Sequence, residues 1–182
     1  MATPFRAELV TPERVLFSGE ADEVSLRTDG GEVAFLANHS ELVAALDITV
    51  VRIRSLEGRA GEGGESDGEE VRFAAHGGFV HVGGNAVQIL AGVAERGDEI
   101  DVDRARQALA SARERFAAEG PATVDAGRPE AAGEQPGAEA HGASPTRPLS
   151  GAMLALLAPG SAEAAVRRAE IRLEAAGARA EA

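Results

Sequence analysis

The stretch VRFAAHGGFVHVGGNAVQILAGVAERGDEIDVDRA, residues 71–105, is where the sequence pattern changes from that of strands to that of a helix. On both sides of Gly83-Gly84-Asn85, hydrophobic residues alternate with polar ones, a period of two that is typical of strands. Glycine and asparagine here accept the positive φ angles that a tight hairpin needs. Asp101 is placed to cap a helix by accepting from the free N–H groups of its first turn. The stretch therefore predicts the last hairpin of a β domain joined directly to a helix.

Upstream of this stretch, short segments with the same alternation predict an antiparallel β-sandwich or barrel. Residues 24–28 and 48–53 are two such segments. A second strand is expected to start at 15–17, and residues 48–53 are expected to form a strand separate from the one at 42–46. Strands this closely spaced leave no room for the crossover helices of a parallel sheet.

The composition changes twice more along the chain. One segment is acidic and glycine-rich, which predicts a mobile insert, and a later one is rich in Pro, Gly, Ala and Glu, which predicts a disordered linker. The fold class is therefore a β-sandwich or barrel followed by a separate two-helix α domain, a segregated α+β arrangement. The expected parts are the β domain at 1–98 with the insert at 57–70, a first C-terminal helix at 99–119, the linker at 120–148 and a second helical segment at 149–182.

Each predicted helix has one narrow hydrophobic stripe. The stripe of the second helix is Ala162, Val166, Ala169, Leu173 and Ala176. Ser161 is placed to cap this helix. Stripes so rich in alanine bury little area, and a long linker lowers the effective concentration of one helix beside the other. We therefore expect a firm β domain carrying a weakly docked helical tail, with a sparsely populated helix pair.

The composition limits the chemistry open to the chain. Only 3% of its 182 residues are aromatic, so Val, Leu, Ile and Ala are expected to fill the core. The net charge of −12 argues against a nucleic-acid partner, because phosphate binding needs clustered cations. The chain has no lysine and no cysteine, which excludes lysine phosphate loops, Schiff bases, thiol nucleophiles and zinc–thiolate centres.

No targeting or membrane-spanning segment is predicted. The N-terminus, MATPFRAELVTPE, lacks the basic region and hydrophobic run of a signal peptide. The hydrophobic run at 152–158 is far shorter than the roughly 20 residues that cross a bilayer. We expect a soluble, cytoplasmic chain that does not insert into a membrane but can bind a membrane-embedded partner.

No catalytic motif is found, so we expect no catalytic residue and no metal. One alternative is an enzyme built on a cupin-like barrel, with a metal held by His39, His76 and His81. His76 and His81 lie five residues apart in one predicted strand. Side chains at that spacing point to opposite faces, which argues against a shared ion unless a bulge at Gly77-Gly78 changes their direction.

Four segments, taken together and in this order, resemble the epsilon subunit of F-type ATP synthases. The resemblance covers residues 4–118 well and 161–177 more weakly. The segments are FRAELVTPERVLFSGE at 5–20, GEVAFLANHSEL at 31–42, HGGFVHV at 76–82 and ILAGVAERGDEIDVDRA at 89–105. The family loop GILPGHA is replaced by AFLANHS at 34–40, which lacks its two glycines and its proline.

This resemblance implies a non-catalytic subunit in the central stalk of a proton-driven ATP synthase. Its partners would be the gamma subunit and the c-ring, at the cytoplasmic face of the cell (plasma) membrane, where it would be peripheral. It would couple rotation of the ring to the catalytic head. The C-terminal helices would rise along gamma into the alpha/beta head and restrain ATP hydrolysis. The alternative is a stand-alone β-sandwich binding module with a nucleotide-sensing helical tail.

The resemblance also implies site residues. Glu32 and His39 would contact gamma or the c-ring. The only cofactor that the resemblance implies is regulatory ATP. It would be bound by Glu95, Ile100, Asp101, Arg104, Arg168 and Arg172. Two guanidinium groups one helical turn apart can bind phosphates. In the simpler interpretation, Asp101 is only a helix cap, and the two arginines of the second helix are solvated or pair with Glu170 and Glu174.

Overall fold

A computed structural model describes residues 3–55, 69–119 and 161–178 of the chain. These residues form seven strands, a short 3-10 helix and two α-helices. The elements are, in chain order, β1 (Phe5–Val10), β2 (Val15–Thr28), β3 (Gly31–Phe35), β4 (Leu42–Ser55), β5 (Glu69–Gly83), β6 (Ala86–Ala91), β7 (Ala94–Arg96), η1 (Gly97–Glu99), α1 (Val102–Glu119) and α3 (Ala162–Ala175).

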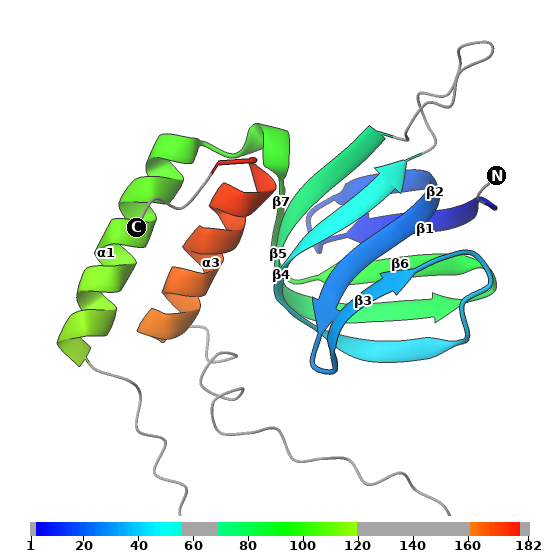
Figure 1. The fold of residues 1–182 in the computed structure, drawn as a ribbon, viewed down its shortest axis with the longest axis horizontal. Helices are drawn as coiled ribbons and strands as arrows, with labels where there is room; N and C mark the ends of the chain where they lie inside the picture. The colour runs from blue at the N-terminus through cyan, green and yellow to red at the C-terminus, as the bar shows by residue number, and fades with distance from the viewer. Residues whose placement is uncertain (1–2, 56–68, 120–160, 179–182) are drawn as a thin grey trace, which may run out of the picture.

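The strands form a closed, flattened barrel, and the two helices stand beside it (Figure 1). The strand order is β1-β6-β5-β4-β2-β3, and a further pairing of β1 with β2 closes the ring. All pairings are antiparallel except that of β1 with β6. The predicted fold class is confirmed. The predicted insert (except residues 69 and 70), the linker and residues 149–160 lie outside the described residues.

The predicted division of β4 into two strands, at 42–46 and 48–53, is wrong. Both β4 and β2 run without a break for 14 residues. The first part of β2 pairs with β1 and its second part with β3 and β4, with register shifts between Ala21 and Glu23 and between Ser25 and Thr28. Such irregularities bend a strand without ending it, so one strand serves both sides of the barrel.

Gly77 and Gly78 reverse the direction in which the side chains of β5 point. Both have positive φ angles, +81° and +140°. Phe73 faces the barrel core before this point, whereas Val80 does so after it. Odd-numbered residues therefore point inward before the glycines and even-numbered ones after them.

His76 and His81 consequently share the outer face of β5, and the prediction that they lie on opposite faces is wrong. The reversal needs the conformational freedom of two successive glycines. Among the described residues, no group of three or more His, Asp or Glu side chains is arranged to hold a metal ion. The alternative of a metal centre built on three histidines therefore has no support from the structure.

The barrel encloses its own core. Its buried members all come from strands, and the largest fully buried ones include Phe35, Phe73, Leu9 and Ile53. The ring of Phe17 packs edge-on against that of Phe73, with centroids 6.3 Å apart. No described residue of either helix belongs to this core. The interior of the barrel is therefore complete without the helices.

A second hydrophobic cluster holds the helices. In Figure 1, α3 is the middle layer, between α1 and the barrel, and it runs antiparallel to α1. Ile48, Val50 and Ala74 supply the outer face of β4 and β5, while Ile171 and Leu173 of α3 are fully buried. Full burial of a residue of this size contributes about 1.5–3 kcal/mol.

The helix pair is therefore formed in this structure, and α3 is held on two sides. The expectation of a single thin hydrophobic stripe is wrong for α3, whereas the expected sparse population of the helix pair stays a prediction. The second stripe of α3 includes Ala164 and Ile171, which the predicted stripe leaves out.

Among the residues that the structure describes, no helix is long and hydrophobic enough to cross a membrane.

Both predicted helix caps are confirmed. Oδ1 of Asp101 accepts from the backbone N–H of Arg104 at 3.0 Å, at the start of α1. Oγ of Ser161 accepts from the backbone N–H of Ala164 at 3.1 Å, at the start of α3. Each cap satisfies an N–H group that has no partner within its own helix, which sets where the helix begins.

Candidate functional site

A cavity of about 410 Å³ lies where α1, α3 and the outer face of the barrel meet. Three of its lining residues are arginines, so the cavity presents several hydrogen-bond donors and positive charges to anything inside it. We call it the arginine cavity. Its lining residues are His76, Val93, Ala108, Arg115, Ala165, Arg168, Ala169 and Arg172.

Three of the residues predicted to bind a nucleotide come together here. Arg168 and Arg172 lie one turn apart on α3 and both line the cavity. Glu95 of β7 accepts a hydrogen bond from the guanidinium group of Arg172. The simpler interpretation gave Arg172 the wrong partner, because Glu174 pairs with Arg52 of β4 and Glu170 with Arg113 of α1.

The other three predicted residues, all at the start of α1, are not among those lining the cavity. Ile100 is buried in the cluster that holds the helices. Asp101 is the helix cap, as the simpler interpretation has it. The side chain of Arg104 is exposed. The structure therefore divides the predicted set into a cavity group and a group at the start of the helix.

Two residues of the cavity, Arg115 and His76, were missed from the sequence. Arg115 lies on α1 seven residues after Ala108, which also lines the cavity, so the three–four spacing of a helix face could have found it. His76 could not be found in this way, because its outward direction depends on the two glycines that follow it.

His76 stays neutral in this position. Its pKa falls from 6.5 to about 4 because the ring is buried and because the charges of Arg172 and Arg168 disfavour protonation, although Glu95 partly opposes this. Nε2 of His76 and Nε of Arg172 are both buried, and neither has a hydrogen-bond partner among the described residues. The cavity thus contains polar atoms whose hydrogen-bonding capacity is unused.

The lowered pKa predicts that docking of α3 weakens as the pH falls from 6.5 towards 4. In that window the undocked chain binds a proton at His76 that the docked chain does not, so docking weakens by up to about tenfold per pH unit. Docking should be measured by hydrogen exchange of α3 at pH 7 and pH 5. His76→Gln should reduce this dependence, whereas His81→Gln, on the same face but exposed, should not. Equal pH dependence in all three proteins would contradict the prediction.

A different surface is formed by exposed hydrophobic residues on the outside of the barrel. Val15 lies opposite Val10, Val10 opposite Leu90, and Leu90 opposite Phe79, so these residues form one row across β2, β1, β6 and β5. Val15, Leu90 and Phe79 are 59%, 52% and 59% exposed. We call this set the apolar row.

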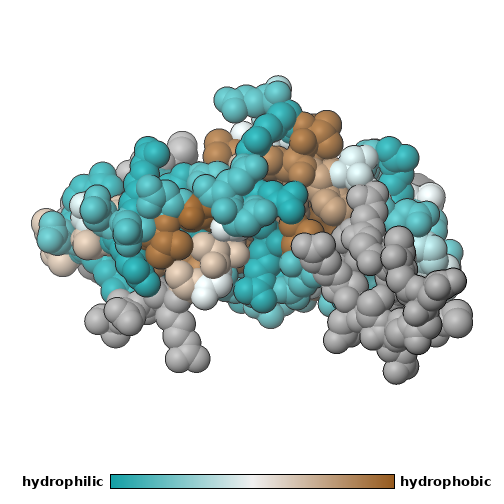
Figure 2. Space-filling view, turned by 90° about the horizontal axis from the view of Figure 1, so that it is seen from above, coloured by the Kyte–Doolittle hydropathy of each residue, from teal (hydrophilic) through white to brown (hydrophobic). Residues whose placement is uncertain are grey.

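The exposed large hydrophobic residues among those described all belong to the barrel domain and none to the helices. Figure 2 shows the same difference from above, with hydrophobic residues exposed over the barrel and a mostly hydrophilic helical end. Isolated exposed hydrophobic residues are common, but a contiguous set marks a binding surface. The barrel is therefore the part of the molecule best suited to a protein partner.

Glu32 lies at the start of β3, and His39 lies in the loop that follows this strand. Glu32 is exposed on β3, opposite Arg27. The ring of His39 packs edge-on against Phe35, with centroids 5.0 Å apart. Asn38 takes a positive φ of 60°, and its N–H donates to Oδ1 of Asn85 at 2.9 Å. Asparagine thus supplies the left-handed conformation in a loop that lacks the family's glycines.

Comparison with known proteins identifies relatives of this chain. A family model described as the beta-sandwich domain of the ATP synthase delta/epsilon chain matches residues 4–97. The ATP synthase epsilon chain of Carboxydothermus hydrogenoformans is 41% identical over 117 residues, which are 64% of this chain and 79% of the relative. That of Streptomyces avermitilis is 39% identical over 125 residues, 69% of this chain and 90% of the relative.

A solved structure has a similar fold. It is a chain in the mitochondrial ATP synthase of Euglena gracilis, in a cryo-EM structure of the OSCP, F1 and c-ring assembly. The TM-score is 0.52 and the identity 22%, over 68% of this chain and 69% of that one. At this identity the likeness concerns the arrangement of strands and helices.

Proposed function

The chain belongs to the family of ATP synthase epsilon chains, which are non-catalytic subunits, and we propose that it serves in the central stalk of an F-type ATP synthase. There it binds gamma and the c-ring, at the cytoplasmic face of the cell membrane, as a peripheral protein. It couples rotation of the ring to the catalytic head. Its helices regulate ATP hydrolysis by leaving the barrel and rising into that head.

The observation that carries this proposal is the apolar row on a barrel that is complete without its helices. A subunit that turns with gamma needs a firm attachment, and the row offers hydrophobic area on adjacent strands for it. A regulatory helix needs to leave without unfolding the attached part. The separation of the two hydrophobic clusters supports this second requirement.

Substitution within the apolar row tests attachment to gamma. In the double variant Phe79→Thr, Leu90→Thr, capture of gamma should weaken by about 30-fold or more, the effect of losing a binding hot spot. Both side chains are more than half exposed, so the fold should be retained. Capture should be measured with the full chain and purified gamma, with circular dichroism as a check of folding.

Gln88→Thr provides the control, because Gln88 lies on the same face of β6, two residues before Leu90. It should capture gamma as the wild type does. If the double variant also binds gamma normally, the apolar row is not the attachment surface. If the wild-type chain does not bind gamma at all, the central-stalk proposal itself fails.

We further propose that the loop with His39 and the exposed Glu32 face the c-ring side of the assembly. Both residues belong to the segment of the chain that resembles the family, and neither is buried in the barrel core. The short contact of Nδ1 of His39 with the carbonyl oxygen of Ser40, at 2.8 Å, fixes the ring orientation. An imidazole ring that is already held in one orientation is suited to contact with a partner.

A second candidate function is regulation by a nucleotide in the arginine cavity. It is favoured by the convergence of Arg115, Arg168 and Arg172 with two buried nitrogen atoms that have unused hydrogen-bonding capacity. Guanidinium groups bind phosphate oxygens through paired hydrogen bonds. This candidate also covers the alternative of a stand-alone binding module with a nucleotide-sensing tail.

Titration of the full chain with ATP tests this candidate. Arg168→Gln and Arg172→Gln should each weaken ATP binding about tenfold, the loss of one charge-assisted hydrogen bond. Arg113→Gln is the matched control, since Arg113 also lies on the helix pair but is not among the residues lining the cavity. Absence of binding to the wild-type chain at millimolar ATP would eliminate the candidate without affecting the central-stalk proposal.

A further inference from the structure

Gly97 is a point at which the end of α3 packs closely against the barrel domain. It is buried in η1. A Cβ atom at this position would lie 2.3 Å from the carbonyl oxygen of Ala175 and 2.9 Å from its carbonyl carbon. Both atoms belong to the backbone of α3, so rotation of a side chain cannot relieve the contact. The docked position of α3 therefore requires a residue without a side chain at 97.

The backbone of Gly97 does not itself require glycine. Its φ lies outside the positive region, unlike those of Gly77 and Gly78. The next nearest atom to a Cβ would be the carbonyl oxygen of Arg72 at 3.2 Å, a tight contact that a shift of a few tenths of an ångström relieves. The contact that excludes a side chain thus comes from α3 rather than from the barrel.

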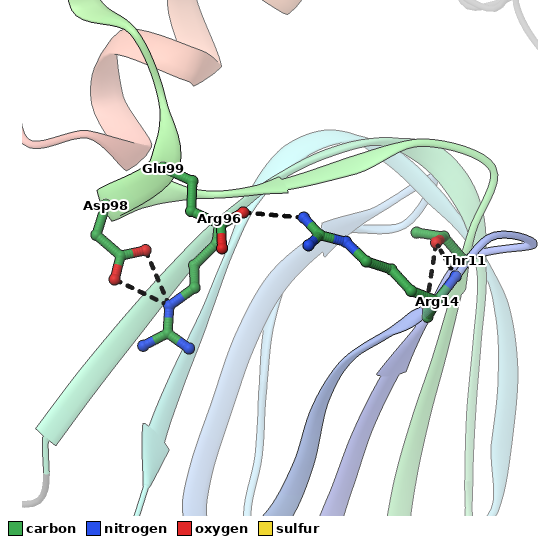
Figure 3. Close-up of polar contacts among 5 residues, drawn as sticks. All are labelled: Thr11, Arg14, Arg96, Asp98 and Glu99. Atoms are coloured by element: carbon green, nitrogen blue, oxygen red, sulfur yellow. Dashed lines mark hydrogen bonds and ion pairs between the residues drawn. The ribbon is translucent and has the colours of Figure 1, made fainter.

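The segment around Gly97 is joined to the barrel on both sides. Before it, Arg96 of β7 pairs with Phe73 of β5 in the sheet. After it, the carboxylate of Glu99 pairs with Arg14 at 2.9 Å, while Asp98 pairs with Arg96 within the segment (Figure 3). Arg14 lies in the β1–β2 turn, where its backbone N–H donates to Oγ1 of Thr11. This anchoring opposes movement of residue 97 away from α3.

The end of α3 is also fixed within itself. The N–H of Ala178 donates to the carbonyl oxygen of Leu173 at 2.8 Å, and the N–H of Gly177 donates to that of Glu174 at 3.0 Å. With Gly177 at a φ of +72°, this is a Schellman motif. Because the motif holds the last turn together, α3 has to move as a unit to avoid a side chain at 97.

We propose that Gly97 sets the docking equilibrium of α3, because its missing side chain is what allows the helix to lie on the barrel. A side chain at this position shifts the chain to the undocked form and leaves the barrel intact. The consequence for ATP hydrolysis rests on the proposed function, whereas the effect on docking does not.

Hydrogen exchange of the full chain tests the effect on docking. In Gly97→Ala, amides of α3 should exchange about tenfold faster or more, the effect of an overpacked contact, while β4 and β5 keep their protection. Gly92→Ala is the matched control, because a Cβ there meets nothing within 4 Å and φ is not positive. It should behave as the wild type does.

Unchanged exchange of α3 in Gly97→Ala would overturn the inference, and so would faster exchange throughout the barrel. ATP hydrolysis by an assembled synthase carrying the variant gives a separate result. With α3 undocked more often, hydrolysis should be slower than with wild type or with Gly92→Ala. If α3 exchanges faster but hydrolysis is unchanged, the docking inference stands and the proposed regulatory role fails.

Discussion

Gly78→Ala is expected to lower the free energy of unfolding of the barrel by about 3 kcal/mol or more. Gly78 has a φ of +140°, which a residue with a side chain rarely adopts. A Cβ would also lie 2.1 Å from the carbonyl oxygen of Leu90 and 2.9 Å from Cα of Ala91. Because β6 is paired with β5 at this point, neither strand can move without breaking the ladder. Urea unfolding followed by circular dichroism measures the loss.

Gly84→Ala separates the two causes of this loss. Gly84 also has a positive φ, +58°, but a Cβ there meets nothing within 4 Å. Its substitution should therefore cost about 1 kcal/mol, from backbone strain alone. If Gly78→Ala costs no more than Gly84→Ala, the close approach of β6 to Gly78 does not hold in solution.

The local features of the fold could be predicted because each depends on a few neighbouring residues. The turn at Gly84 and Asn85 follows from residues that accept positive φ, and both have it, at 58° and 57°. The caps at Asp101 and Ser161 follow from side chains that accept from the next turn. The barrel follows from alternation, because only one face of each strand reaches its core.

The reversal at Gly77 and Gly78 could not be predicted, because it depends on how two strands cross rather than on a local preference. On both sides of the glycines every second residue of β5 faces the core. These are the odd-numbered residues before the glycines and the even-numbered ones after them. The two glycines allow a bulge, but the sequence does not show that the inward-facing positions change there. Regular alternation therefore places His76 on the wrong side relative to His81. The same limit hides His76 from the candidate site.

Only part of the candidate site could be predicted, again because packing between elements decides the rest. Arg168, Arg172 and Glu95 were all predicted from the family resemblance. Their convergence with Arg115 depends on how α1, α3 and β5 pack, which no spacing within one segment specifies. Asp101 was assigned two roles from the sequence, and the structure supports the role of a cap.

The docking of α3 leads to the second large expected effect, in Ile171→Asp. Ile171 is fully buried, in a cluster with Val50 and Ala74 on the outer face of the barrel. A carboxylate there would be buried in a hydrophobic cluster, so docking should weaken by about 3 kcal/mol or more. Hydrogen exchange and limited proteolysis should both show α3 released. Glu174→Ala, an exposed residue of the same helix, should change docking by less than about 1 kcal/mol.

The barrel itself should survive this substitution, because no described residue of a helix belongs to its core. Release of α3 uncovers only the outer residues of β4 and β5, such as Ile48 and Val50, so unfolding of the barrel should change little. If the barrel unfolds together with α3, the two clusters form one cooperative unit, and the helix cannot leave without destroying the part that binds gamma. The proposed movement requires the two clusters to be separable, and Ile171→Asp measures whether they are.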